Sequence, residues 1–360
     1  MVALHSSDPA TVYLSVRARM RSFAPHDLER ALYDERSLVR MLGMRRTMFV
    51  VPLETAAVMD EACTKPLVPP ERRRLVGMLE AQGIVEPGSG ERWVDEVSAR
   101  TFDALSARGE ATARELTRDV PELGNRIAVG EGKRWAGEMG VSTRILFLLA
   151  TEGRIVRGRP LGGWTSGQYR WATTASWLGR PLPVFDRADA RARLLSMWLR
   201  AFAPATLTDV RWWAGWAAKA ATSALEAVGA VQVELDDGAG FVLPDDARPV
   251  RRVDPWAAFL PGLDPTAMGW KERAWYLGEH APRLFDRNGN AGPTVWADGR
   301  VVGGWAQTAA GDVEVEILEP VSAAARRRIE TERRRLREWL GDVRIKTRFA
   351  SPLERALAGR

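Results

Sequence analysis

The feature that most constrains the fold of this chain is a repeated order of helices and strands. Residues 93–106 carry apolar side chains at helical spacing, and Ala111–Leu116 predicts a short helix after them. Ser142–Thr151 predicts a longer helix with Ser142 as its cap. Two alternating stretches, 154–157 and 168–172, flank a glycine-rich connection and predict a β-hairpin. Helix, short helix, longer helix and hairpin is the order of a winged helix–turn–helix.

The same order returns further along the chain. Residues 187–202 predict a helix, a short helix follows, and 217–228 predicts the third helix of this copy. Residues 230–243 then predict a hairpin around a turn rich in aspartate and glycine. The short helices of the two copies begin alike, with Ala111–Glu115 (ATARE) and Ala205–Asp209 (ATLTD). Each places a small residue and a threonine ahead of an acid, as the N-cap of a second helix requires.

The two ends of the chain follow different patterns. A weaker copy occupies 11–52, with helices predicted near 11–21 and 26–33 before a strand at Met44–Val51. Residues 251–320 alternate with period two, and Asp298–Gly299 is a strong hairpin signal. A basic helix over 321–340 and a strand over 343–349 are expected to close the chain.

These patterns predict an α+β fold of tandem winged helix–turn–helix modules followed by a small β-rich domain. Residues 1–86 are expected to form a first module that lacks its first helix, and 87–183 a second module with a glycine-rich wing. A third module is expected in 184–250, and a β-rich domain with a basic helix in 251–360. A first module without its opening helix would pack poorly. We therefore expect the true start of the protein to lie upstream of Met1.

Composition excludes several classes of protein. The chain is 46% hydrophobic and 27% charged, a globular balance. Its longest apolar run, Ile145–Ala150, is too short to cross a bilayer, and no export signal opens the chain. One cysteine, Cys63, and three scattered histidines make a metal site unexpected. Val129–Lys133 (VGEGK) lacks the spacing of a phosphate loop, so no nucleotide cofactor is expected. A cytoplasmic location follows.

Positive charge gathers at the two ends of the chain. Of the 52 basic residues 47 are arginines, whose planar fork suits phosphates and guanine edges. Residues 321–360 have a net charge of +7 and residues 1–50 of +3, whereas the middle has −4. This distribution fits contact with a polyanion. A GC-rich coding sequence would also favour arginine, and Arg326–Arg337 equally fits a solvated helix face with Glu–Arg pairs.

Four stretches resemble the bacterial winged-helix DNA glycosylases of the AlkZ and YcaQ type. They are Leu4–Leu14, Leu42–Pro52, Gly153–Trp171 and Leu260–Trp305. The resemblance implies three tandem winged helices with a C-terminal β domain. It also implies excision of alkylated bases or unhooking of interstrand crosslinks, without a cofactor, by a monomer on double-stranded DNA at the nucleoid.

The resemblance also implies where the reaction takes place. In characterised relatives the segment that matches Leu4–Pro9 reads Leu-Gln-x-Gln or Leu-Gln-x-Asp, and its two polar side chains position the attacking water. His5 and Ser7 occupy these two positions here, and Asp8 follows. A neutral imidazole accepts a hydrogen bond from water, and Asp8 is placed to orient the ring or offset the charge of the sugar. The alternative is that Ser7 and Asp8 cap the next helix and His5 is only a polar residue in the entry turn.

Further residues are candidates for DNA contacts. They lie at the first module's strand, the third helix of the second module, its wing, and the Asp298–Gly299 turn: Arg45, Arg46, Arg144, Arg157, Arg159, Gln168, Arg170 and Arg300. By resemblance Asp264 and Arg273 lie near the active site, although Asp264 before Pro265 also fits the cap of a turn. Two hypotheses remain: a DNA glycosylase, or a winged-helix DNA-binding protein without activity.

Overall fold

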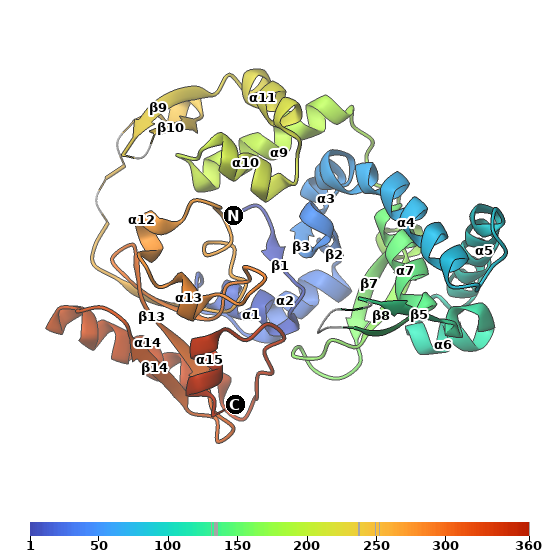
Figure 1. The fold of residues 1–360 in the computed structure, drawn as a ribbon. Helices are drawn as coiled ribbons and strands as arrows, with labels where there is room; N and C mark the ends of the chain where they lie inside the picture. The colour runs from blue at the N-terminus through green and yellow to red at the C-terminus, as the bar shows by residue number, and fades with distance from the viewer. Residues whose placement is uncertain (131, 133–135, 237, 249, 252, 360) are drawn as a thin grey trace. The chain divides into compact units, whose positions relative to one another are not determined.

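The computed structural model describes residues 1–130, 132, 136–236, 238–248, 250–251 and 253–359 (Figure 1). It is 47% helical and 19% strand, which confirms the predicted α+β class. The chain forms two compact units, one from Glu29–Arg191 and one from Met1–Leu28 together with Ala192–Arg360. Glu131 and Lys133 of the VGEGK stretch lie outside the described residues.

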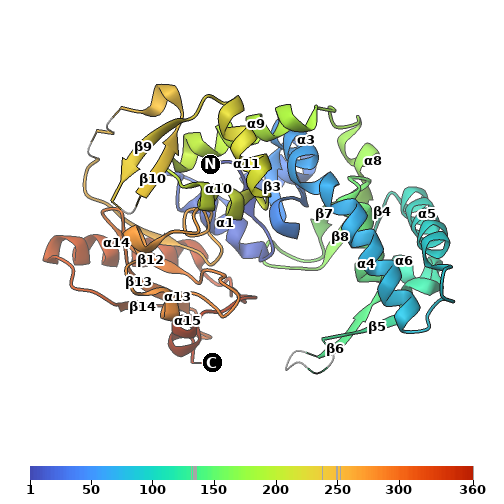
Figure 2. The same ribbon diagram turned by 45° about the horizontal axis from the view of Figure 1, so that its top comes forward.

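The Glu29–Arg191 unit combines helices with an antiparallel sheet. Its main elements are β2 (Leu38–Leu42), β3 (Met48–Pro52), α3 (Leu53–Met59), α4 (Val68–Ala81), α5 (Gly90–Arg108), β4 (Glu110–Ala111), α6 (Ala113–Asp119), β5 (Arg126–Val129), β6 (Gly137–Gly140), α7 (Val141–Thr151), β7 (Ile155–Pro160), β8 (Tyr169–Thr173) and α8 (Thr174–Leu178). Within this unit the strands lie in the order β3-β2-β7-β8-β4. A separate hairpin, β5–β6, extends away from the helices (Figure 2).

Helix α5 to strand β8 contain the predicted helix, short helix, longer helix and hairpin in order, with the hairpin β5–β6, which was not predicted, between α6 and α7. Gly109, at φ 74°, follows the last residue of α5, and Thr112 with Glu115 forms a complete capping box at α6. Strand β4 pairs with β8, so the segment before the short helix joins the edge of the hairpin. Leu105, Leu116 and other apolar side chains of these helices meet in one buried core.

Two local predictions in this unit are wrong. Helix α7 is capped at Gly140 rather than at Ser142, because β6 leads directly into the helix and Val141 already belongs to the core. Of the strand predicted over 44–51 only 48–51 forms, as part of β3, because Met44–Arg46 is a tight 3₁₀ turn between β2 and β3 in which Arg45 and Arg46 have φ of 51° and 64°.

The second copy lies in the other unit and repeats the details of the first. Its elements are α9 (Arg187–Phe202, whose first turns precede Ala192), α10 (Leu207–Ala214), α11 (Ala218–Ala227), β9 (Val231–Leu235) and β10 (Gly238–Val242). Thr206 and Asp209 form a capping box at α10, and Ala205 bridges Phe241 of the hairpin. Both predicted N-caps are therefore confirmed, and each second helix is joined to its hairpin in the same way.

The N-terminal and C-terminal segments complete this unit. They contribute β1 (Leu4–His5), α1 (Pro9–Arg17), α2 (Pro25–Glu29), β11 (Ala257–Leu260), α12 (Ala274–Leu277), α13 (Ala281–Leu284), β12 (Thr294–Ala297), β13 (Arg300–Gln307), β14 (Val313–Ile317), α14 (Ala323–Leu340) and α15 (Pro352–Leu357). Strands β11 to β14 form an antiparallel sheet in chain order, against which α14 and α15 pack (Figure 1). Asp298 and Gly299 make the predicted two-residue turn, with φ of 49° and 91°.

The strand predicted over 343–349 does not form. Its backbone is held by side chains instead: Gln307 Nε2 donates to the Val343 carbonyl at 2.9 Å, and Gln307 Oε1 accepts from Ile345 N at 2.9 Å. Asp8 Oδ2 accepts from Arg348 N at 2.9 Å. These partners lie far away in sequence, so the local alternating pattern was misleading.

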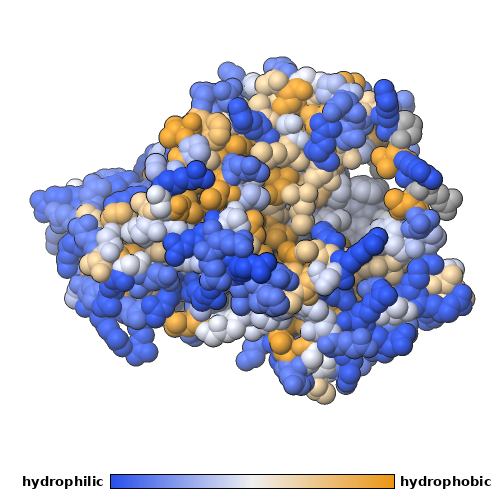
Figure 3. Space-filling view, turned by 180° about the vertical axis from the view of Figure 1, so that it is seen from behind, coloured by the Kyte–Doolittle hydropathy of each residue, from blue (hydrophilic) through white to orange (hydrophobic). Residues whose placement is uncertain are grey.

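Figure 3 shows one face on which hydrophilic side chains predominate and apolar ones gather in patches between them. Among the helices in the described part of the chain, none is long and apolar enough to cross a membrane.

Candidate active site and nucleic-acid interface

The segment from His5 to Asp8 connects β1 to α1. His5 is buried, with 7% of its surface exposed, and its Nδ1 accepts a hydrogen bond from Ser7 N at 3.4 Å. Because Nδ1 is an acceptor here, the proton of a neutral ring lies on Nε2, which then donates. The sequence analysis expected the imidazole to accept a hydrogen bond from water. With this tautomer Nε2 is a donor instead.

Both oxygens of Asp8 serve the backbone. Oδ1 accepts from Ala10 N at 3.1 Å, which caps α1, and Oδ2 accepts from Arg348 N. The guanidinium of Arg348 also donates to the Ser7 carbonyl at 3.4 Å. Burial raises the pKa of Asp8 above its ordinary value, against the backbone N–H groups that favour the charged form. Asp8 therefore caps α1, as one part of the alternative predicted, whereas parts for His5, Ser7 and Asp8 in the reaction stay predictions.

Asp8 also borders a small cavity of about 20 Å³, which has room for about one water molecule. Thr11 and Leu14 of α1 line one side, and Gln307, Thr347 and Glu354 line another. Asp8 is the one residue of the His5–Asp8 segment that lines this cavity, so the cavity connects the segment with polar side chains of the β-rich part.

Asp264 is the centre of a buried ion pair in the same unit. It has no exposed surface, and its oxygens accept from both terminal nitrogens of Arg19 at 2.7 and 2.8 Å. Ser15 Oγ donates to it at 2.7 Å, and Thr266 N donates at 2.9 Å, which is the expected turn cap. Asp264 therefore ties α1, which follows the His5–Asp8 segment, to the loop after β11.

The two other candidates of this unit lie on its β-rich part. The Arg273 guanidinium lies 5.0 Å from the ring centre of Trp212 and 4.6 Å from that of Phe285, and burial lowers its pKa. Arg300 is exposed beside the Asp298–Gly299 turn, with its Nε 3.5 Å from Glu319. Of these two side chains, Arg300 is open to a ligand and Arg273 packs between aromatic rings.

A cluster of arginines forms in the Glu29–Arg191 unit. Arg46 Nε lies 2.9 Å from Glu71 of α4, and its guanidinium lies 5.6 Å from the ring centre of Phe147 on α7. Burial, Arg74 and Arg46 all lower the pKa of Arg144 at the start of α7. Three cations thus gather around one carboxylate, an excess that favours an anion such as phosphate. The sequence pattern missed Arg74, which lies on a helix that carried no motif.

Arg45 lies in the same turn as Arg46, half-buried, and the wing carries the other candidates. Arg157 lies 5.3 Å from the ring centre of Tyr169, and Arg40 of β2, which the sequence analysis did not single out, lies 4.6 Å from it. Arg159 forms an ion pair with Asp34 at 2.7 Å and stacks on Tyr33. Gln168 is exposed and Arg170 half-exposed, both at the start of β8. The wing therefore presents polar groups at its tip, whereas its base stacks arginines on aromatic rings.

Asp60 is a buried carboxylate that no pattern predicted. It begins a π-helical turn, Asp60–Thr64, and burial raises its pKa from 3.8 to about 6, against the attraction of Lys65. Among the described residues no group of three or more His, Cys, Asp or Glu side chains is arranged to hold a metal ion.

We expect Asp60→Asn to raise the free energy of unfolding near neutral pH by about 2 kcal/mol. The folded-state pKa of Asp60 lies above its ordinary value, so ionising the buried carboxyl costs stability above about pH 6. This cost is relieved as the pH falls from 6 towards 4. Urea unfolding of both proteins at several pH values measures the difference, which should shrink towards pH 4. A constant difference across this range would contradict the assignment.

A family model and one solved structure match this chain. The model of the DNA glycosylase AlkZ-like family matches residues 1–339. The chain belongs to the AlkZ-like DNA glycosylase family. Streptomyces sahachiroi DNA glycosylase AlkZ has a similar structure, with a TM-score of 0.68 and 18% sequence identity over 96% of this chain and 90% of that one. At this identity the AlkZ structure supports the shared fold, and no curated protein matches the chain in sequence. The resemblance drawn from four sequence stretches is confirmed for this AlkZ-like chain.

Proposed function

We propose that this DNA glycosylase excises alkylated bases, above all N7-substituted purines, or unhooks interstrand crosslinks in double-stranded DNA. The observation that carries the proposal is the family match over residues 1–339, which includes the His5–Asp8 segment. The chain acts as a monomer at the nucleoid, without a nucleotide cofactor and away from membranes.

The architecture that supports this function is a series of three winged helices, in 1–86, 87–183 and 184–250, before a β domain in 251–360. The shared capping boxes at Thr112 and Thr206 support the second and third modules. In each, the longer helix that follows, α7 or α11, is the element that enters a groove in this class of fold.

The reaction needs little acid–base chemistry. An N7-alkylated purine carries a positive charge before it leaves, so the sugar carbon requires only an oriented water molecule and a stabilised positive charge. With Nδ1 accepting from Ser7 N, the Nε2–H of His5 donates to that water, whose lone pair attacks the sugar carbon as the neutral base leaves, and the proton that the water then releases passes to solvent. The Ser7 hydroxyl takes the second position of the motif, and Asp8 holds the segment in place.

Binding rests mainly on phosphate contacts. The Arg46–Arg74–Arg144 cluster and the exposed polar groups Gln168 and Arg170 of the wing supply them in the Glu29–Arg191 unit. Arg45, Arg157 and Arg159 contribute beside them, and Arg300 contacts DNA from the β domain. Asp264 and Arg273 hold the surroundings of the site in shape.

We expect the double variant Arg46→Gln/Arg144→Gln to bind duplex DNA more weakly and with less dependence on salt. Loss of two phosphate contacts should reduce the slope of log K against log salt by about 1.8. Fluorescence anisotropy between 50 and 200 mM salt measures it. Arg92→Gln/Arg118→Gln is the matched control, because these arginines are exposed on α5 and α6 of the same unit. An equal change in both double variants would contradict the assignment.

A second candidate is a winged-helix DNA-binding protein without glycosylase activity. It is favoured by the departure of His5 and Ser7 from the glutamine-containing pattern of characterised relatives. Base release from a duplex with one N7-methylguanine, in a single turnover with excess protein, separates the two. Release above the spontaneous rate supports the glycosylase. Salt-dependent binding with no release from this duplex or from a crosslinked one supports the second candidate.

A further inference from the structure

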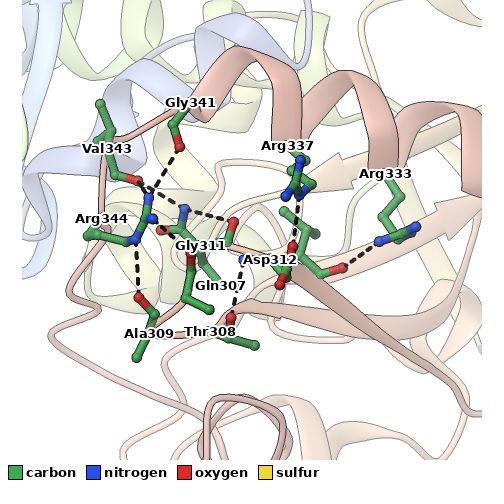
Figure 4. Close-up of polar contacts among 12 residues, drawn as sticks. Gln307, Thr308, Ala309, Gly311, Asp312, Arg333, Arg337, Gly341, Val343 and Arg344 are labelled. Atoms are coloured by element: carbon green, nitrogen blue, oxygen red, sulfur yellow. Dashed lines mark hydrogen bonds and ion pairs between the residues drawn. The ribbon is translucent and has the colours of Figure 1, made fainter.

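Helix α14 has three different sides. Ala325, Ile329, Leu336 and Leu340 are buried against the sheet. A second side contacts the β14 region: Arg333 Nη1 donates to the Val313 carbonyl at 3.1 Å, and Arg337 Nε lies 2.8 Å from Asp312 (Figure 4). These arginines stabilise the fold, so the helix is more than a solvated basic face.

The third side of α14 lines an open groove, here called the α14 groove. The groove consists of two hollows of about 720 and 480 Å³ that share Ala257, Glu332 and Arg335. The end of α1 and the residues after it, through Phe23, line the larger hollow, and Trp256 lines the smaller one. Every one of these residues belongs to the same compact unit.

Positive charge in the α14 groove exceeds the negative charge around it. Six arginines line the groove: Arg17, Arg19, Arg21, Arg327, Arg328 and Arg335. Three acids neutralise part of this charge, because Asp264 pairs with Arg19, Asp298 pairs with Arg328, and Glu332 is shared by Arg17 and Arg335. Within the described chain Arg21 and Arg327 have no acidic partner, and the excess is three positive charges.

The crowding of these cations is itself unfavourable. Arg17 Nη1 lies 3.9 Å from Glu332, at the limit of an ion pair, whereas Arg335 lies 2.6 Å from the same carboxylate. Burial and the charge of Arg335 both lower the pKa of Arg17. A bound anion would relieve this repulsion.

We propose that the α14 groove binds a single strand of DNA, with the arginines on its phosphates and the aromatic rings beside its bases. Phe23 and Trp339, stacked at 20° with their centroids 6.1 Å apart, lie at one end, and Trp256 lies in the other hollow. A basic groove with aromatic side chains is the arrangement that holds single strands without sequence preference. This binding goes beyond the proposed function, since no step of base release requires it.

The test is binding of a fluorescent oligothymidylate to the full chain and to Arg21→Glu/Arg327→Glu. Two lost phosphate contacts should reduce the salt slope by about 1.4, and reversal of charge should lower the affinity at low salt at least about tenfold. The matched control, Arg326→Glu/Arg334→Glu, changes the net charge equally at exposed positions of the same helix outside the groove. Its affinity should stay within about twofold of the unaltered chain.

A second pair of variants tests the stacking. Trp256→Ala should weaken oligothymidylate binding roughly tenfold. Trp275→Ala, which removes a tryptophan that is 60% exposed and lies outside the groove, should leave it unchanged. Equal weakening by both charge variants, or no weakening by the groove variants, overturns the proposal. Displacement of the oligothymidylate by an equal concentration of blunt duplex would show that the α14 groove does not prefer single strands, which also overturns the proposal.

The outcome does not depend on the glycosylase reaction. Base release by the groove variants, measured with saturating protein, should equal that of the unaltered chain. Loss of oligothymidylate binding with base release intact supports the α14 groove. If the unaltered chain releases no base and the groove variants still lose oligothymidylate binding, the proposed function is overturned and single-strand binding by the α14 groove is supported.

Discussion

His5→Ala should lower the single-turnover rate of base release from N7-methylguanine duplex by about 10²–10³-fold, within the range for loss of a positioned proton-transfer or hydrogen-bonding group. His5 is buried in β1 and its Nδ1 accepts from Ser7 N, which helps to fix the ring, and we assign its Nε2–H to the attacking water. Duplex affinity should stay unchanged, because the phosphate contacts come from other residues.

His5→Gln separates two roles for this side chain. If Nε2–H only orients water, a glutamine amide also donates, and we expect His5→Gln to keep most of the activity. If the imidazole removes a proton from water, His5→Gln should be as slow as His5→Ala. Equal rates for His5→Ala and the unaltered chain would contradict any part for His5 in the reaction.

Asp264→Ala should lower the free energy of unfolding by about 3 kcal/mol, since it leaves a charged partner without its buried carboxylate. The two nitrogens of Arg19 and the hydroxyl of Ser15 all lose their acceptor. The cost stays below the largest values for buried pairs, because the Arg19 side chain is 28% exposed and regains some hydration. Denaturant unfolding measures the change.

Glu330→Ala is the matched control for this loss. It removes an exposed Glu–Arg pair on α14, with Arg333 at 2.8 Å, and should cost less than about 0.5 kcal/mol. Similar costs for the two variants would contradict the assignment of Asp264 as the centre of a buried network. Loss of base release in a fully folded Asp264→Asn protein would instead give Asp264 a part in the reaction.

Local signals in the sequence predicted the repeated helices well. Gly109, Gly153 and Gly229 follow the ends of their helices at positive φ, and the Thr112 and Thr206 caps form as expected. The fifteen tryptophans lie mostly at helical spacing or in strands, a pattern that predicts core positions rather than exposed base-stacking surfaces. Among those described, Trp198, Trp213 and Trp216 are buried, and only Trp275 is largely exposed.

The candidate sites were predicted less completely. The pattern found Arg46 and Arg144 but not Arg74, and it found Asp8 but not Arg348, which is bound to it across 340 positions. The spacing of residues along a surface helix does not show which of its arginines lie beside a carboxylate on another element. Such pairs depend on packing between elements that are distant in the chain.

The sequence by itself determined the order of the elements and the ends of the helices, because caps, glycines and apolar periodicity act within a few residues. It also carried the four stretches that place the chain in its family. Only the tertiary structure decided that His5 Nδ1 is an acceptor, that Asp264 lies in a buried ion pair, and that 343–349 is no strand. Hydrogen-bond partners and burial arise when distant segments of the chain meet. The protonation of a polar side chain and the strength of its hydrogen bonds therefore depend on the tertiary structure.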